Sequence, residues 1–244
     1  MAAGIASGFI TAILQTKMGI NSLLAGIIVN TGLYSINIAV MSGSSILNMN
    51  KTDTVFTKMA ALLKGTPVAR QSKLFVAIIA VAAVAVILGL FLKTRLGLAI
   101  RATGDNPDMV RSSSVNPAFT TIIGLCVANS FTALSGCLLA QSQRSVNIDI
   151  GTGMVTIALA SLLIGGVFLG RKKMPLRIFG MVLGAFIFRL IYTIALRFDM
   201  PAFMLKFVSS VIVIAAIATP YFKKQLPLLK RRIQTRSGRR KADA

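Results

Sequence analysis

The sequence predicts an all-α fold, a polytopic bundle of transmembrane helices, and three observations support this prediction. Of the 244 residues, 55% are hydrophobic and only 14% are charged, whereas soluble domains contain about 25% charged residues. About six apolar segments approach the roughly 20 residues that a helix needs to cross a bilayer. The apolar runs are continuous, without the alternation of a membrane strand, so we expect helices and not strands.

The six expected spans follow one short apolar segment at the N-terminus. They cover residues 18–41, 74–92, 119–140, 152–169, 178–196 and 203–221. The first segment, 1–14, reaches only about 21 Å as a helix, less than the roughly 30 Å of the hydrocarbon core. We expect a half-helix or the remainder of a longer span there. The predicted organisation is a transmembrane domain over 1–222 and a basic tail over 223–244.

The net charge of +21 is placed as in membrane proteins and not as in nucleic-acid-binding proteins. Many of the 27 Lys and Arg residues lie at the ends of apolar runs, and no aromatic platform for base stacking accompanies them. The loops 93–117 and 171–177 and the tail carry most of the positive charge, so the positive-inside rule places them and the C-terminus in the cytoplasm. The loop 42–73 then lies on the opposite side. Membrane lipids are the expected counter-charge for the tail.

The composition argues against catalysis by this chain. It contains no His, its six acidic residues are all Asp, and it has neither a phosphate-binding Walker A pattern nor a Gly-x-Ser-x-Gly elbow. We therefore expect neither an enzyme nor a bound metal or cofactor. Cys126 and Cys137 lie about 16 Å apart along one helix, too far to bridge, and are interpreted as small, buried apolar side chains.

The loop 93–117 contains a pattern that predicts a short helix between two spans. Gly104 permits a tight turn. Asp105 or Asn106 can cap a helix that has Pro107 at its first position and Asp108 in its first turn.

This short helix is expected to stop at Asn116, because the residue before a proline disfavours the helical conformation. It would have about nine residues and measure near 13 Å, with Asp108 and Arg111 on its polar surface. An exposed rigid helix suits docking into a groove of a partner protein. A solvated, well-capped loop is the alternative that the residues leave open.

The segment Arg101-Ala-Thr-Gly-Asp-Asn-Pro-Asp-Met-Val-Arg111 resembles the coupling loop of ABC transporter permeases of the branched-chain amino acid, simple sugar and nucleoside importer group. Those loops commonly read Arg-Ala-x-Gly-x-Asn-Pro before a short helix. The matching positions are Arg101, Ala102, Gly104, Asn106 and Pro107, while the family often has Glu where Asp105 stands.

The resemblance covers nearly the whole chain. Residues 17–26 and 31–37 look like members that are paired with a binding lipoprotein for aromatic or other amino acids, and 184–191 and 205–207 resemble the closing helices of the family. The family usually has one or more helices before the segment that begins here at Met1. We therefore expect a truncated or late-started version of the family's chain.

The resemblance implies a multi-pass permease subunit of the bacterial plasma membrane that forms the path for an amino acid or related small solute. A second permease copy would complete the pore. An ABC ATPase subunit would bind ATP and Mg and dock on the loop residues Arg101 to Asn116, and an extracytoplasmic binding lipoprotein would deliver the solute. The basic tail is a second, less favoured contact for the ATPase.

Two functions from other classes remain as alternatives. A secondary carrier driven by an ion gradient would need intramembrane acids or an inverted repeat, and the six Asp residues all fall in loops, at helix ends or in the tail. A membrane-embedded enzyme or structural subunit has no recognisable site.

Polar residues recur on one face of two expected spans. The first stripe comprises Asn30, Tyr34 and Asn37, and the second comprises Asn129, Thr132 and Ser135. Such stripes must face protein or water and not lipid. They predict either a translocation path or hydrogen bonds between helices, and the residues leave both readings open.

Arg189 lies near the middle of its span, where an Arg costs roughly 2.5–3.5 kcal/mol on insertion scales. We expect it to be a structural brace that contacts Tyr192, backbone carbonyls or water. Close helix packing is expected at the three Gly-x-x-x-Gly pairs. They are Gly4/Gly8, Gly166/Gly170 and Gly180/Gly184.

Overall fold

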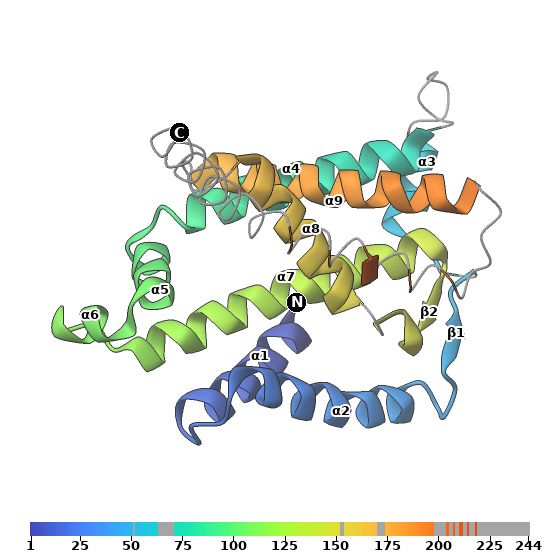
Figure 1. Cartoon of the computed structure of the whole chain (residues 1–244). Coiled ribbons are helices and arrows are strands. Elements are labelled where there is room, and N and C mark those ends of the chain that lie inside the picture. Colours follow the sequence, from blue (N-terminus) through green and yellow to red (C-terminus); the bar gives the residue numbers. More distant parts are fainter. Residues whose placement is uncertain are drawn as a thin grey trace, which may run out of the picture. The chain divides into compact units, whose positions relative to one another are not determined.

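The computed structural model describes residues 1–50, 52–62, 71–151, 154–169 and 174–197, with isolated positions between 204 and 218. It divides into two compact units, Met1–Asp149 and Ile150–Ala244, and each unit is described by itself. The described part of each unit is mainly helical (Figure 1), which confirms the predicted helical fold.

The first unit contains most of the described elements. Its helices are α1 (Ala2–Thr16), α2 (Ser22–Val40), α3 (Val55–Leu62), α4 (Ser72–Phe91), α5 (Arg95–Asp105), α6 (Pro107–Ser112) and α7 (Pro117–Gln143). Its strands are β1 (Ile46–Asn48) and β2 (Ser145–Asn147). The 3-10 turn η2 (Ile148–Gly151) lies at the boundary, and the second unit contains α8 (Met154–Leu169) and α9 (Met174–Arg197).

Four of the described helices, α2, α4, α7 and α9, are long and apolar enough to cross a membrane. Each coincides with a predicted span. Helix α8 coincides with the prediction at 152–169, but its 16 residues reach only about 24 Å. Helix α1, with 15 residues, corresponds to the short N-terminal segment. Most of the predicted span 203–221, and the whole of the basic tail 223–244, lie outside the described residues.

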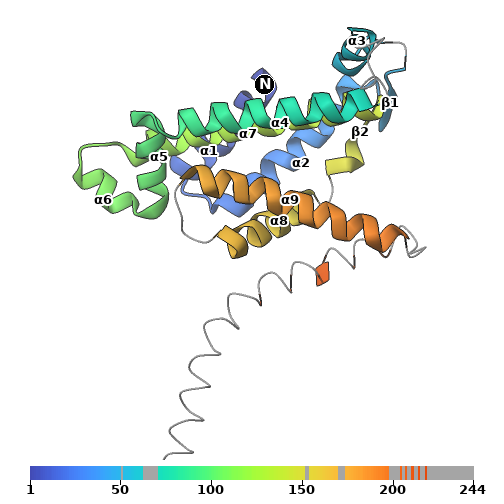
Figure 2. The ribbon, with the colours of Figure 1, turned by 90° about the horizontal axis from the view of Figure 1, so that it is seen from above.

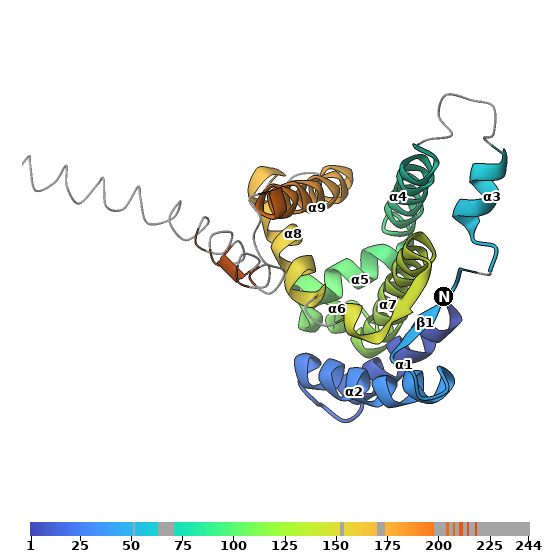
Figure 3. The ribbon, with the colours of Figure 1, turned by 90° about the vertical axis from the view of Figure 1, so that its right-hand side faces the viewer.

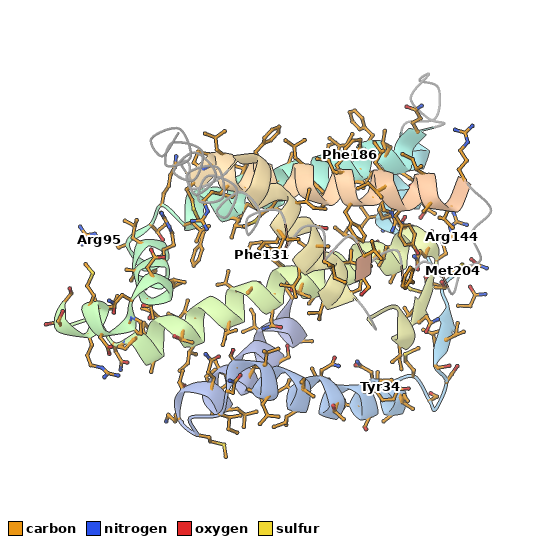
Figure 4. The ribbon with its side chains drawn as sticks, viewed as in Figure 1. Tyr34, Arg95, Phe131, Arg144, Phe186 and Met204 are labelled. Carbon is orange, nitrogen blue, oxygen red and sulfur yellow. The ribbon has the colours of Figure 1, made fainter. Side chains whose placement is uncertain are left out.

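The four candidate spans expose apolar side chains along their length, as expected of helices that face lipid. In each of α2, α4 and α7, only 6% of the residues in the apolar stretch are buried within the protein. Leu23 and Val40 on α2 are 75% and 78% exposed, and Leu90 on α4 is 61% exposed. A soluble protein rarely leaves such continuous apolar surface in water, so this surface supports an integral membrane protein (Figure 4).

Helices α1 and α7 pack closely through small residues, as Figures 1 and 3 show. Gly4 and Gly8 are both buried, and Ala12 is 0% exposed. A Cβ atom on Gly8 would lie 2.6 Å from the carbonyl oxygen of Leu125 on α7, too close for any side chain. The packing role predicted for Gly4 and Gly8 is therefore confirmed.

The helices α8 and α9 of the second unit lie side by side (Figure 2) and also pack through glycines. Gly180 and Gly184 on α9 are buried, and a Cβ on Gly184 would lie 2.6 Å from the backbone nitrogen of Gly165. The prediction for Gly180/Gly184 is confirmed. The prediction for Gly166 was wrong, because its Cβ position faces open space and Gly165 makes the contact instead. Gly170 lies outside the described residues.

Two short strands add to the expected all-α fold. β1 and β2 pair antiparallel, with Ile46 opposite Asn147 and Asn48 opposite Ser145. Both strands lie in loops outside the apolar runs, so the expectation that those runs are helical is unaffected. The ladder joins the segment after α2 to the residues that follow α7 (Figure 1).

Candidate functional site

The region expected to be one loop helix folds as two helices, α5 and α6. Thr94 begins α5, because its Oγ1 accepts a hydrogen bond from the Gly97 N–H at 3.2 Å. The tight turn that Gly104 permits does not form. Gly104 lies inside α5, and the Asn106 N–H bonds to the Ala102 carbonyl at 2.9 Å, so the helical turn continues across the glycine.

Asn106 separates the two helices and caps the second. Its extended backbone, with φ −157° and ψ 103°, ends α5. Its side-chain Oδ1 accepts hydrogen bonds from the N–H groups of Asp108 and Met109, at 3.0 and 3.1 Å. Pro107 occupies the first helical position of α6, and Asp108 lies in the first turn. The predicted cap is confirmed, and Asn106 is the capping residue in place of Asp105.

Helix α6 ends at Ser112, earlier than the predicted stop at Asn116. Ser114 adopts the left-handed conformation, with φ 60°, and the Val115 N–H bonds to the Val110 carbonyl at 3.3 Å. The Ser114 N–H bonds to the Arg111 carbonyl at 3.2 Å. These two bonds form a Schellman motif, which closes a helix by satisfying its last carbonyls.

Buried contacts with α7 hold this helical pair in place. The hydroxyl oxygens of Thr103 on α5 and Thr120 on α7 are 2.7 Å apart and share a hydrogen bond, and Thr120 is only 1% exposed. Val110 of α6 is 5% exposed. Asn116 caps α7 by accepting a bond from the Ala118 N–H at 2.9 Å. The surface of α5 and α6 is therefore carried on a fixed scaffold.

The outward surface of α5 and α6 combines charge with apolar area. Its charged side chains are all exposed, and they are Arg95, Arg101, Asp105, Asp108 and Arg111. Met109 is 65% exposed and Leu98 is 51% exposed. Arg95 is labelled in Figure 4 at the start of α5. Exposed anchors on a short rigid helix can fill a groove in a partner, so we interpret this surface as a docking site.

Helix α5 and its hydroxyl contact with α7 were not predicted from the sequence. The signal was present, because Leu96, Ala99, Ile100 and Thr103 recur at the spacing of one helix face. The prediction was based instead on Gly104-Asp-Asn-Pro107, which indicates a turn and a helix cap. Nothing in the sequence indicated that Thr103 would pair with Thr120, since that contact depends on how α5 folds back on α7.

The two polar stripes differ in their hydrogen bonding. Asn30, Tyr34 and Asn37 on α2 are exposed, and no described residue bonds to their side chains. On α7, the Asn129 Nδ2 donates to the Leu125 carbonyl at 3.0 Å, and the Thr132 hydroxyl donates to the Ala128 carbonyl at 3.1 Å. Hydrogen-bond donors of the second stripe are thus satisfied by backbone carbonyls of α7, whereas the side chains of the first stripe bond to no described residue. The role of the exposed Ser135 in that stripe stays a prediction.

Arg189 lies over the ring of Tyr192, one of the contacts expected for it. Its guanidinium carbon is 5.6 Å from the ring centroid, a cation–π geometry. The rings of Tyr192 and Phe188 are stacked with centroids 6.4 Å apart, and Phe188 is 2% exposed. Arg189 itself is exposed, so its function as a brace stays a prediction.

No group of metal-ligating side chains occurs among the residues that the structure describes. Cys126 and Cys137 are both free thiols. Cys126 is half-buried, and Cys137 is exposed and accepts a bond from the Gln141 Nε2 at 3.3 Å. The exposed Cys137 departs from the expectation of a buried apolar side chain.

Comparisons with known proteins identify relatives over most of the chain. Residues 1–217 match the family described as branched-chain amino acid transport system / permease component. The tyrosine transport system permease protein of Clostridioides difficile is 32% identical over 88% of this chain and 69% of its own length. An uncharacterized protein of Rickettsia prowazekii is 30% identical over 67% of this chain and 55% of its own length.

A more distant relative is the autoinducer 2 import system permease protein LsrC of Yersinia enterocolitica. It is 23% identical over 88% of this chain and 56% of its own length. The chain therefore spans between about half and about two thirds of the length of these relatives. No solved structure matches it.

Proposed function

This chain belongs to the family of permease components of branched-chain amino acid transport systems, and from that premise we propose that it forms the solute path of an ATP-driven importer. The family is one of transport components and not of catalytic subunits, so the predicted permease class and the absence of an enzymatic role are confirmed.

The observation that carries the proposal is the capped, exposed helix α6. An ATPase subunit would bind ATP and Mg and dock on the surface of α5 and α6, with Met109 as an apolar anchor and Asp108 and Arg111 as charged contacts. Because Thr103 and Thr120 join α5 to α7 at 2.7 Å, movement of the docked ATPase would be transmitted to a spanning helix. Such coupling needs a rigid connection between the partner and the bundle.

Two further partners and the solute belong to the same proposal. A second copy of the permease would complete the pore, and an extracytoplasmic binding protein would deliver the solute. The C-terminus would face the cytoplasm. The solute is proposed to be an amino acid or a related compound, a class supported by the name of the Clostridioides difficile relative, a tyrosine transport permease. The first stripe, Asn30, Tyr34 and Asn37, would line the path.

Replacement of both Asp108 and Arg111 by Ala tests this proposal. The double variant should insert into the membrane normally but lose solute uptake by roughly tenfold or more, because two charged contacts with the ATPase disappear together. Uptake of labelled solute in cells and the amount of permease in isolated membranes are the measurements.

The double variant Asp53→Ala with Lys17→Ala is a matched control, because both side chains are exposed and lie outside α5 and α6. It removes one acid and one base but leaves α6 intact, and it should leave solute uptake unchanged. Unimpaired uptake by the Asp108 and Arg111 double variant would rule out α6 as the coupling element.

A further inference from the structure

Helix α9 carries a polar patch within an otherwise apolar stretch. The patch consists of Arg189, Tyr192 and Thr193, which are spaced by three and four positions and therefore share one face of the helix. Residues 178–188 before it include no polar side chain. Because arginine keeps its proton in proteins, the patch places a permanent positive charge within a helix that is long and apolar enough to cross a membrane.

The patch lies beside the face of α9 that packs on its neighbour α8. That face contains the buried residues Gly180, Gly184 and Phe188. Arg189 and Thr193 are exposed instead. Within the part of this unit that the structure describes, the contact between α8 and α9 thus leaves the charged end of the patch uncovered.

Local contacts orient the guanidinium of Arg189 and leave its N–H groups available. The guanidinium carbon lies 5.6 Å from the ring centroid of Tyr192, and that ring stacks on the buried Phe188 with centroids 6.4 Å apart. A cation–π contact uses no hydrogen bond, so the five N–H donors of the side chain remain free for another group. No ion pair or hydrogen bond joins them to a residue that the structure describes.

The backbone beside the patch is already satisfied. The Thr193 hydroxyl donates a hydrogen bond to the Arg189 carbonyl at 2.8 Å, which lets the hydroxyl lie within an apolar helix. Helical side chains normally lean towards the N-terminus of their helix, whereas Arg189 extends over Tyr192, one turn towards the C-terminus. The aromatic ring therefore directs the guanidinium along the helix, away from its usual orientation.

No acidic side chain is available among the spans to neutralise Arg189. The six Asp residues of the chain all lie outside α2, α4, α7 and α9. A second copy of this chain would add the same helices and therefore no acid to them. An arginine within a span is costly unless it meets a counter-charge or water, and the contact with Tyr192 offsets only part of that cost. The counter-charge must therefore come from another molecule.

We infer that Arg189, with Tyr192 and Thr193 beside it, is a contact site for the carboxylate of the solute as it crosses the membrane. The inference rests on the proposed function, in which this chain forms the path of an amino acid or a related compound. The fork of an arginine can hold a carboxylate with two hydrogen bonds, and the hydroxyl of Tyr192 can donate another. Such a site favours solutes that carry a carboxylate over amines and sugars that lack one.

The experiment measures uptake of a radiolabelled mixture of the protein amino acids by the complete importer in proteoliposomes. Arg189→Gln removes the positive charge. Arg197→Gln is the matched control, because Arg197 is exposed at the end of the same helix. Each variant is compared in neutral phosphatidylcholine and in anionic phosphatidylglycerol, since a lipid phosphate is the other anion that could meet Arg189. The melting temperature and the ATPase activity are measured alongside.

A second arm restores the charge chemically. In a chain with Cys126 and Cys137 replaced by Ser, Arg189→Cys is treated with the cationic reagent aminoethyl methanethiosulfonate or with the neutral methyl methanethiosulfonate. Both reagents add a group at the same position, but only the first returns a positive charge.

Arg189→Gln should lower uptake by roughly tenfold in both lipids, the loss expected when a charge-assisted hydrogen bond disappears. Its melting temperature and the stimulation of the ATPase by loaded binding protein should not change. Arg197→Gln should transport like the original chain. The cationic reagent should restore most of the uptake of Arg189→Cys, and the neutral reagent should restore none.

Unchanged uptake by Arg189→Gln would overturn the carboxylate site. A lowered melting temperature, or a cationic reagent that restores no more uptake than the neutral one, would show a structural brace and would also overturn it. A loss confined to phosphatidylglycerol would assign Arg189 to lipid, with the same consequence. If the original importer takes up none of the amino acids, the proposed function itself fails.

Discussion

At the scale of single residues, side-chain hydrogen bonds separate the polar groups that the helices satisfy from those that they do not. Thr31 lies on α2 between the stripe residues, and its hydroxyl bonds to the Ile27 carbonyl at 2.9 Å. Such a bond lets a hydroxyl sit in an apolar environment, because its donor is already used. An amide such as Asn30 has more donors and acceptors than one backbone carbonyl can satisfy, so it requires water or a partner.

This difference yields a prediction for cysteine labelling. In a chain with Cys126 and Cys137 replaced by Ser, we expect Asn30→Cys and Asn37→Cys to react with a membrane-impermeant maleimide during transport. Thr132→Cys should react more slowly, because the hydroxyl that it replaces is satisfied within α7. The measurement is the labelled fraction by gel shift in intact cells.

Ile28→Cys provides the control for labelling on α2. It lies on the same helix, and the residue there is 46% exposed, but its helical position points about 160° away from Asn30. Reaction of Ile28→Cys at the rate of Asn30→Cys, or no reaction at Asn30 and Asn37, would show that the stripe does not line a water-filled path.

At the scale of helices, close packing depends on which glycine meets a neighbouring backbone. A Cβ on Gly4 would lie 2.7 Å from the Ala133 Cβ, whereas a Cβ on Gly32 of α2 would meet nothing within 4 Å. Glycine spacing alone predicted the contacts of α1 and α9 correctly. It failed on α8, because only Gly166 has a glycine four residues away, whereas the neighbouring Gly165, which follows Ser161 at that spacing, makes the contact.

The same substitution should therefore have opposite effects at two glycines. Gly8→Ala should lower the melting temperature of the purified protein, because its Cβ would lie 2.6 Å from the Leu125 carbonyl oxygen and the helices must separate. Overpacking of this kind costs about 1–3 kcal/mol. Gly32→Ala should be neutral or stabilising, by up to about 1 kcal/mol, because alanine favours the helix. Equal melting temperatures for the two variants would contradict the close contact of α1 and α7.

The helix boundaries show how far local sequence determines elements. Asn106 and Asn116 act as caps, each followed by a proline at the first helical position. The first of these signals predicted where α6 begins, whereas Asn116 was expected to end the loop helix and not to cap α7. The ends were harder to predict. Helix α6 ends at Ser112 and is closed by the left-handed Ser114, although serine carries no strong preference for that conformation. The helix packs on α7 and its Val110 is 5% exposed, so its end also depends on contacts beyond the local sequence.

At the scale of the whole molecule, composition and run length predicted the membrane class and most spans, since a bilayer requires long apolar helices. The short ladder of β1 and β2 was not predicted, because strands of three residues carry almost no periodic signal. The candidate docking site on α6 was predicted from its turn and cap residues. Its connection to α7 was not predicted, because the hydrogen bond between Thr103 and Thr120 depends on how α5 folds back on α7.

If α6 docks on an ATPase subunit, a cysteine placed on α6 should form a site-specific crosslink to that subunit. In the cysteine-free background, Met109→Cys replaces an exposed residue of α6, and Ile46→Cys replaces an exposed residue of β1. Each is treated with a short bismaleimide in membranes that contain the assembled importer. We expect a crosslink between the permease and the ATPase for Met109→Cys and none for Ile46→Cys. A crosslink to the ATPase at Ile46→Cys but not at Met109→Cys would contradict it.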